Sequence, residues 1–181
     1  RGLGDVYKRQ TIVCGSNHTI ATKTDGTLWS WGYNGFGQLG QNNKINLSSP
    51  AQIGSGTTWL KASCGYALSI ALKTDGTMWS WGFNDSGQLG QNDKVYRSSP
   101  VQVGALTTWS NIGVGYSCSF AVKTDGTLWS WGKNGQGQLG QNDRVYRSSP
   151  VQVGALTNWS SIVASINHVV AIKTNGTLWS W

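Results

Sequence analysis

The side chains that could carry out acid–base or metal chemistry are few in this sequence. It has two histidines, His18 and His168, and they lie near opposite ends of the chain. Its three cysteines show no Cys-x-x-Cys spacing, so the ligand pattern of a structural zinc site is missing. Outside the first ten residues, the acids lie in predicted turns or long polar loops: Asp25, Asp75, Asp85, Asp93, Asp125 and Asp143. We therefore expect no catalytic site, no metal and no cofactor, and a protein that is not an enzyme.

Two glycine-rich segments, Gly35–Gly40 and Gly135–Gly140, match the Gly-x-Gly-x-x-Gly pattern of dinucleotide-binding loops. In such a site the loop leads into a helix, and an acidic residue follows about 20 residues later. Here each segment leads into a polar stretch that ends in proline, and Asp85 replaces the first glycine in the intervening copy. We interpret these two segments and the intervening copy as tight turns, each packed onto the domain by one core leucine: Leu39, Leu89 and Leu139.

Charge and composition favour a β-rich domain over a nucleic-acid-binding one. The formal net charge is +7, but the first ten residues supply three positive charges and one negative charge, which leaves +5. The remaining basic residues are scattered and form no stripe, so nucleic acid is an unlikely partner. Eleven tryptophans and abundant small polar residues indicate strands and turns. Cys14, Cys64 and Cys118 are expected to be buried free thiols, because their number and spacing form no disulfide framework.

Both ends of the sequence are abrupt. Residues 1–10 (RGLGDVYKRQ) share nothing with the rest, and we expect them to be a non-native leader that resembles translated adaptor sequence. Trp181 stops one residue short of the glycine that follows the equivalent tryptophan elsewhere. We therefore expect residues 11–181 to be part of a larger domain. We expect the natural N-terminus to lie outside this sequence, and we favour an extracellular, cell-surface or virion location over a cytoplasmic one.

The elements that position these residues repeat every 50 residues without interruption. A lysine recurs at one phase of this period: Lys23, Lys73, Lys123 and Lys173. Tryptophan pairs recur at a second phase: Trp29/Trp31, Trp79/Trp81, Trp129/Trp131 and Trp179/Trp181. A fixed period of this length indicates a repeat architecture, in which neighbouring units bury a common core.

Each repeat contains a predicted hairpin, Ser119–Gly132 in the third. Its turn residues are Asp25–Gly26, Asp75–Gly76, Asp125–Gly126 and Asn175–Gly176. Asp-Gly and Asn-Gly favour a two-residue type I′ turn. Both central residues of this turn have positive φ, which Asp, Asn and Gly tolerate better than other residues. This turn would pair Val122 with Trp129. Since side chains alternate along a strand, one face of the hairpin would carry the bulky residues Phe120, Val122, Trp129 and Trp131, and the other Ala121 and Ser130.

The rest of each repeat supplies two more strands. Trp109–Gly115 is predicted to be an inner strand, and Val151–Val153 an outer strand that follows a long loop and Pro150. Four antiparallel strands in 50 residues make one blade of a β-propeller, whose sheets pack face to face. We expect the bulky face of one blade to stack on the small-residue face of the next.

Three segments resemble the signature of the regulator of chromosome condensation repeat: WGYNGFGQLGQ, WGFNDSGQLGQ and WGKNGQGQLGQ. The Asp-Gly-Thr turn and Gly15–His18 resemble the same family, although Leu68 and Cys118 replace the histidine in the middle repeats. The resemblance implies an all-β fold, a seven-bladed propeller. About three and a half blades are expected here, in an open arc, with the missing blades of the same chain as neighbours. The style of the sequence is similar to bacterial or viral members.

The resemblance implies that the protein binds another macromolecule, and it leaves the identity of that macromolecule open. Members of the family include a nucleotide exchange factor for a small GTPase, a plant ultraviolet-B photoreceptor, modules of ubiquitin ligases and a β-lactamase inhibitory protein. Their common property is binding another macromolecule on a propeller face. We expect a non-catalytic scaffold that binds an unidentified protein or surface macromolecule. The alternatives are an exchange factor for a small GTPase and a carbohydrate-binding or enzymatic propeller.

The repeated tryptophans and lysines have simple structural interpretations. Tryptophans at one phase in every repeat are expected to be core: Trp29, Trp31, Trp79, Trp81, Trp129 and Trp131. Sugar stacking and ultraviolet sensing are the functional alternatives. The lysines before each turn are expected to be solvated side chains at the blade ends, with a functional ring of lysines as the alternative.

Positions that differ between the repeats indicate where a partner binds. The variation is concentrated in the first turn and the long loop of each repeat, which strand direction places at one end of the blades. Loops on a rigid scaffold commonly carry function, and exposed tyrosine and phenylalanine are frequent at interfaces. We therefore predict a partner-binding face made by Tyr33, Phe36, Tyr66, Phe83, Tyr116 and Lys133.

Overall fold

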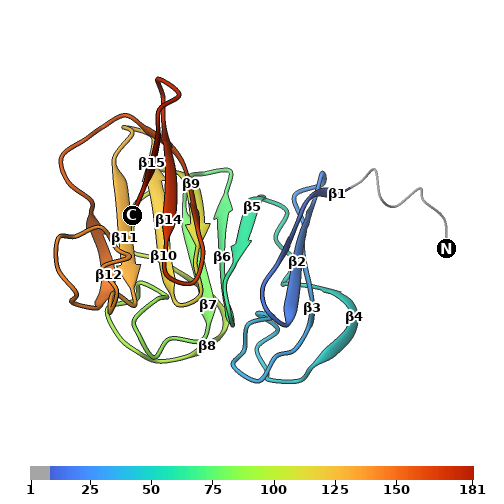
Figure 1. The fold of residues 1–181 in the computed structure, drawn as a ribbon. Helices are drawn as coiled ribbons and strands as arrows, with labels where there is room; N and C mark the ends of the chain where they lie inside the picture. Colours follow the sequence, from blue (N-terminus) through green and yellow to red (C-terminus); the bar gives the residue numbers. More distant parts are fainter. Residues whose placement is uncertain (1–8) are drawn as a thin grey trace.

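The computed structural model describes residues 9–181, which form four antiparallel sheets (Figure 1). We call them blades 1 to 4. Blade 1 contains β1 (Arg9–Cys14), β2 (His18–Lys23), β3 (Leu28–Gly32) and β4 (Leu47–Gln52). Blade 2 contains β5 (Trp59–Cys64), β6 (Leu68–Lys73), β7 (Met78–Gly82) and β8 (Arg97–Gln102). Blade 3 contains β9 (Trp109–Val114), β10 (Cys118–Lys123), β11 (Leu128–Gly132) and β12 (Arg147–Gln152). Blade 4 has three strands: β13 (Trp159–Ala164), β14 (Val169–Lys173) and β15 (Leu178–Ser180).

The sheets follow one another along the chain and form an open arc of propeller blades, as the repeat predicted (Figure 1). The first strand of each blade is the inner one, because β1, β5, β9 and β13 contact their neighbours across the blade junctions. Within residues 9–181 no helix has the length and hydrophobicity needed to cross a bilayer. β1 begins at Arg9, two residues inside the segment predicted to be a leader; residues 1–8 lie outside the described part.

The hairpin turns lie where the sequence predicted them, but the type I′ assignment is wrong. Only the glycine of each pair has positive φ, +77° at Gly126. Gly126 N donates to the Lys123 carbonyl (2.9 Å) and Lys123 N donates to the Thr127 carbonyl (3.0 Å). This is a three-residue loop, a type I turn followed by a glycine bulge. The aspartate takes part through its side chain: Asp125 Oδ1 accepts from Thr127 N (2.9 Å) and Thr127 Oγ1 (2.7 Å).

The longer turn shifts the strand register by one residue, so the predicted faces are also wrong. Phe120 lies opposite Ser130, and Ala121 lies opposite Trp129. A shift of one residue moves one strand's side chains to the other face relative to its partner. The two faces of blade 3 are therefore an aliphatic face, with Phe120, Val122, Leu128 and Ser130, and a tryptophan face, with Ser119, Ala121, Trp129 and Trp131. Each face mixes large and small residues, and the blades still stack.

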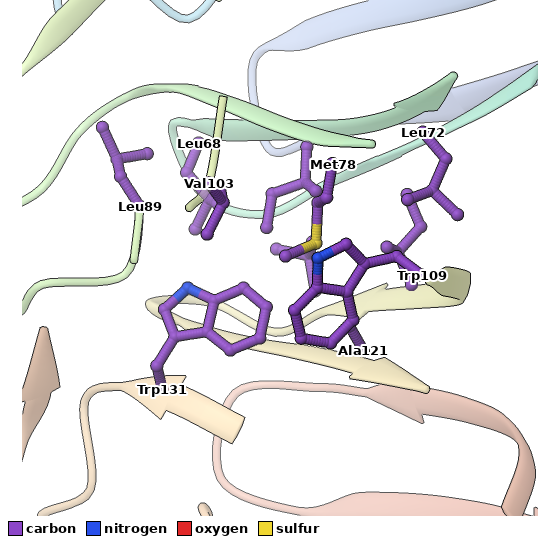
Figure 2. Close-up of a cluster of buried hydrophobic side chains, with 11 residues drawn as sticks. Leu68, Leu72, Met78, Leu89, Val103, Trp109, Ala121 and Trp131 are labelled. Atoms are coloured by element: carbon purple, nitrogen blue, oxygen red, sulfur yellow. The ribbon is translucent and has the colours of Figure 1, made fainter. Parts of the chain in front are cut away.

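The aliphatic face of each blade packs against the tryptophan face of the next. Figure 2 shows one such junction, where Leu68, Leu72 and Met78 of blade 2 face the indoles of Trp109 and Trp131 from blade 3. Trp81, Trp131, Leu39, Leu89 and Leu139 are fully buried or nearly so, whereas Trp29, Trp31, Trp79 and Trp129 are half-buried. Truncating a fully buried tryptophan typically costs about 3–5 kcal/mol, so these junctions are major contributors to stability.

Each junction is also closed by hydrogen bonds to one loop carbonyl. The Gln38 carbonyl of blade 1 accepts from Trp81 Nε1 (2.9 Å) and Ser69 Oγ (2.8 Å) of blade 2. The next junction repeats the pair, with Trp131 Nε1 (2.9 Å) and Ser119 Oγ (2.7 Å) donating to the Gln88 carbonyl. These buried donors are thus satisfied by the neighbouring blade, which helps to fix the relative position of the blades.

The histidine of the Gly-x-x-His segment belongs to this junction. His18 is buried, and its Nε2 lies 3.0 Å from Ser69 Oγ. Because Ser69 already donates its only hydrogen to the Gln38 carbonyl, Nε2 must be the donor to Ser69. Burial lowers the pKa of His18 to about 4, which keeps the ring neutral near neutral pH. His18 therefore has a structural role in blade 1. Leu68 and Cys118 occupy the equivalent buried positions in blades 2 and 3.

Two features of the blade edges differ from expectation. Pro100 and Pro150 lie inside the outer strands β8 and β12, not before them, where a register shift between Ser130 and Gly132 interrupts the pairing of β12. A proline is tolerated at such an edge because it donates no ladder hydrogen bond. The aliphatic face of blade 4 is open: Val163, Ile172 and Leu178 are 71%, 40% and 67% exposed.

Candidate functional site

The predicted binding residues lie at one end of the blades, which we call the loop end. The long loop that follows β3, β7 or β11 returns beside the turn between the first two strands of its blade. Hydrogen bonds join the two: Tyr33 N to the Asn17 carbonyl (2.8 Å), Phe83 N to the Ala67 carbonyl (2.9 Å) and Lys133 N to the Ser117 carbonyl (2.9 Å). The variable turns and the variable loop positions therefore share one surface.

The loops are held in place by a buried asparagine. Asn84 Oδ1 accepts from Leu89 N (2.9 Å), and its Nδ2 donates to the Asp93 and Val95 carbonyls (both 3.1 Å). Asn34 and Asn134 make the equivalent bonds in the other loops. These side chains are completely buried. The loop backbone is thus the same in each blade, and the side chains that vary are displayed from fixed positions.

Five of the predicted residues form a continuous aromatic strip across blades 1 to 3. Phe36 contacts Tyr33 (ring centroids 6.1 Å apart) and Phe83 (5.0 Å), both edge to face. Phe83 contacts Tyr66 (6.3 Å), which stacks on Tyr116 at 4.5 Å with 22° between the rings. Such pairs contribute about 0.5–1.5 kcal/mol each beyond burial. The structure therefore brings together, in one strip, residues that are up to 83 positions apart in sequence.

Tyr96 belongs to the aromatic strip and was missed by the sequence analysis. Its ring lies 5.8 Å from Phe36 and 5.1 Å from Phe83. Its hydroxyl donates to Asp85 Oδ1 (2.6 Å), and this hydrogen bond, with smaller contributions from burial and the carboxylate charge, raises the pKa of Tyr96 to about 12. Because tyrosine recurs at the same phase in Tyr146, it looked like a repeated structural residue. The one sign in the sequence that this position varies is Asn46, which occupies it in the first repeat.

The aromatic strip is partly exposed to solvent. Tyr33 and Tyr116 are 41% and 38% exposed, whereas Phe36, Tyr66 and Phe83 are half-buried. Lys133 occupies the position of Tyr33 and Phe83 in blade 3 and is half-buried. It lies near Cys118, whose pKa is raised to about 12 by burial despite the opposing lysine charge. The six predicted residues thus lie on one end, but Lys133 borders the aromatic strip and takes no part in its ring contacts.

The opposite end of the blades, the Asp–Gly end, has a different construction. Each repeated lysine places its ammonium over indole rings: Lys123 Nζ lies 3.8 Å from the centroid of Trp129 and 5.2 Å from that of Trp109. Lys23, Lys73 and Lys173 make the equivalent contacts at 4.1, 4.0 and 3.9 Å. The prediction that these lysines are simply solvated is therefore wrong, because cation–π contacts hold them against the tryptophans. The lysines of the Asp–Gly end thus pack against the tryptophans of their own blades.

A cavity of about 320 Å³ opens at the inner side of the arc, beside the loop end. It is lined by the ends of the inner strands, including Cys14, Cys64, Tyr66, Tyr116 and Ile166. Cys118 is buried, but Cys14 is exposed, so the prediction of buried thiols does not hold for all three; all are free. Within residues 9–181 no three His, Cys, Asp or Glu side chains gather as a metal site requires.

The repeat unit and its motifs define the family. The profile of the Regulator of chromosome condensation (RCC1) repeat matches residues 25–72, 75–122 and 125–172. A second profile of this repeat matches residues 10–38, 60–88 and 109–138. The chain belongs to the RCC1 repeat family.

Similarity to curated relatives is local. A segment of 39 residues is 46% identical to the ultraviolet-B receptor UVR8 of Arabidopsis thaliana and covers 22% of this chain and 9% of that protein. A segment of 68 residues is 41% identical to the Protein RCC2 homolog of Danio rerio, over 35% of this chain and 13% of that protein. The matched segments thus span a small part of the length of these relatives.

Similarity to solved structures covers nearly the whole chain. The crystal structure of human WBSCR16 matches with a TM-score of 0.84 and 22% identity, over 96% of this chain and 46% of that one. Prp20p of Saccharomyces cerevisiae, described with its binding properties to Gsp1p and histones, matches with a TM-score of 0.83 and 25% identity, over 98% of this chain and 45% of that one. The chain spans less than half the length of these structures, and the fold is that of RCC1-type propeller blades.

Proposed function

We propose that this chain is a non-catalytic scaffold that binds another protein through its loop end. The aromatic strip, formed by Tyr33, Phe36, Tyr66, Phe83, Tyr96 and Tyr116, is the observation that carries the proposal. Tyrosine and phenylalanine supply much contact area with few rotatable bonds, which is why aromatic residues are enriched in interfaces. The rigid loops beneath the strip reduce the entropy lost on binding.

The relatives support a protein as the partner. Prp20p is described with its binding to Gsp1p and histones, and the same yeast protein was solved bound to Kap60. We infer that the identity of the partner is set by the positions that differ between the repeats.

The test is selection of binders from a random peptide-display library with this chain as the bait. Each selected binder is then measured against Tyr33→Ala/Tyr116→Ala and against Phe36→Ala/Phe83→Ala. We expect on the order of tenfold weaker binding or more, since centrally placed aromatic residues are common hot spots. The first pair changes the two most exposed rings and removes two ring contacts, so the melting temperature should fall by a few degrees and the chain should stay folded.

The matched control is Thr74→Ala/Thr124→Ala, which changes exposed positions beside two turns at the Asp–Gly end. Selected binders should keep their affinity for this variant. Binders that lose affinity for the threonine variant and keep it for both aromatic variants would place the interaction surface at the wrong end, and the proposal would be abandoned.

A further inference from the structure

The loop end carries more positive charge than its own contacts use. Its charged residues are six cations (Lys44, Lys94, Arg97, Lys133, Arg144 and Arg147) and three acids (Asp85, Asp93 and Asp143). Six positive charges against three negative ones leave +3. At the Asp–Gly end, four lysines (Lys23, Lys73, Lys123 and Lys173) face three acids (Asp25, Asp75 and Asp125), which leaves +1. The surplus is therefore larger at the end that carries the aromatic strip.

All three acids of the loop end already have partners. Asp93 pairs with Arg97 and Asp143 with Arg147, each at 2.6 Å. Asp85 accepts the hydroxyl of Tyr96. Among residues 9–181, these two aspartate–arginine pairs are the ion pairs formed. Lys44, Lys94, Lys133 and Arg144 therefore have no carboxylate partner within the described chain.

Two of these unpaired cations border the aromatic strip. Lys44 is exposed, and its Nζ lies 5.9 Å from the ring centroid of Tyr96. Lys133 follows β11, and its backbone is bonded to Ser117, the residue after Tyr116. Lys44 thus lies beside Tyr96, and the backbone of Lys133 lies beside the turn that carries Tyr116. Lys44 is exposed and Lys133 is half-buried, and neither has a carboxylate partner among the described residues, so both charges are available to the carboxylates of a partner.

We propose that the loop end binds an acidic protein segment, whose apolar or aromatic side chains contact the aromatic strip and whose carboxylates pair with Lys44 and Lys133. This inference rests on the proposed function and names the chemistry of the partner. Complementary charge around an apolar centre steers association and selects among partners. The three acids of the loop end do not compete for these lysines, because each already has a partner.

A nucleic acid fits the same surface less well. Proteins that bind single strands stack successive bases on free aromatic faces, whereas here Tyr66 and Tyr116 stack on each other and the remaining rings meet edge to face or tilted. The cations are also separated along the surface and do not form the continuous stripe that follows a phosphate backbone. A polypeptide with spaced carboxylates matches this arrangement better.

The test uses fluorescein-labelled random copolymers as probes, followed by anisotropy. Poly(Glu,Tyr) is expected to bind the chain, and to bind more weakly as the salt concentration is raised through about 0.1 M, because screening acts on exposed charges. Poly(Lys,Tyr) and the single strand oligo(dT) are expected to bind at least tenfold more weakly than poly(Glu,Tyr). Stronger binding of either probe would overturn the proposal, as would the absence of poly(Glu,Tyr) binding.

Two variants with the same change in net charge locate the contact. Lys44→Gln/Lys133→Gln removes two positive charges at the loop end, and Thr74→Glu/Thr124→Glu adds two negative charges at the Asp–Gly end. Poly(Glu,Tyr) should bind on the order of tenfold more weakly to the lysine variant only. Equal weakening in both variants would show an effect of net charge alone and contradict the proposal.

The two proposals fail in different ways. If Phe36→Ala/Phe83→Ala abolishes binding of display-selected peptides but Lys44→Gln/Lys133→Gln leaves poly(Glu,Tyr) binding unchanged, the loop end remains the interface and the acidic partner is rejected. If the selected peptides bind the Asp–Gly end, the proposed function fails first. Thermal unfolding of each variant confirms that the fold is retained.

Discussion

The two ends of the blades use the same residue types for different purposes. At the Asp–Gly end, side chains bond inward: Asp125 holds Thr127, Thr127 Oγ1 accepts from Trp129 Nε1 (2.9 Å), and Lys123 covers the Trp129 ring. At the loop end, the buried asparagines bond inward in every blade, but the residues above them change from blade to blade. A position that repeats therefore serves folding, and a position that differs is free to serve binding.

The largest loss of stability is expected at the Asp–Gly end, from Gly126→Ala. Gly126 has a φ of +77°, and a Cβ there would clash with the Thr157 carbonyl oxygen in the connection to blade 4. Backbone cannot move aside as a side chain can, so we expect about 4 kcal/mol from left-handed strain and the clash together. The free energy of unfolding in urea measures the effect.

Gly176→Ala separates the two causes. Gly176 has a φ of +82°, but a Cβ there meets nothing within 4 Å. The strain alone should cost about 1 kcal/mol. Equal losses in the two variants would show that contact between blades contributes nothing to the requirement for glycine.

Asn84→Ala is expected to lower the free energy of unfolding. Repeated positions of the loop end would then stabilise the fold, as those of the Asp–Gly end do. The substitution leaves Leu89 N and two loop carbonyls without partners in a buried site. Unsatisfied buried groups cost about 1–3 kcal/mol each when water cannot replace the bond, and we expect a loss of about 3 kcal/mol in urea unfolding. Ser86→Ala, at a position that varies between repeats in the same loop, should change stability by less than about 0.5 kcal/mol. Similar costs for the two variants would remove the distinction between repeated and variable positions.

The strand order and the two ends could be predicted from the sequence, whereas the register could not. The 50-residue period, the turn glycines and the tryptophan pairs determine four strands per blade and place the variable loops together. The register depends on whether Asp125 takes positive φ. The sequence Asp-Gly is compatible with both turns, and the hydrogen bonds from Thr127 to Asp125 favour the longer one. The sequence placed the other five aromatic residues on one face but did not predict their ring contacts, and it missed Tyr96, because the repetition of tyrosine at Tyr146 concealed the contact with Phe36.

A pH-dependent loss of stability is expected from His18 at the loop end. The folded protein lowers the pKa of His18 from 6.5 to about 4 because the ring is buried. Between these values the unfolded chain binds the proton and the folded chain does not, so stability falls as the pH decreases from 6.5 towards 4. The loss attributable to His18 should be about 2 kcal/mol by about pH 4.5, within the limit of 1.36 kcal/mol per pH unit. It is measured as urea unfolding against pH.

The control for His18 comes from the second repeat, where Leu68 occupies the equivalent position. His18→Leu removes the titrating group and leaves every carboxylate in place. The difference between the two pH profiles should then be confined to pH values below about 6.5. Parallel profiles would mean that His18 is not the group whose protonation destabilises blade 1.

The smallest expected effect compares one lysine at each end, Lys123→Met and Lys133→Met. Methionine keeps an unbranched chain of similar length and removes the ammonium. Lys123 lies over two indoles, and losing this cation–π contact should cost about 1 kcal/mol and change the tryptophan fluorescence. Lys133 makes no contact with an aromatic ring among the described residues, so its substitution should leave both stability and fluorescence unchanged while weakening the binding of poly(Glu,Tyr). If Lys133→Met destabilised the protein as much as Lys123→Met, the cation at the loop end would be a structural residue, and its availability to an acidic partner would have to be given up.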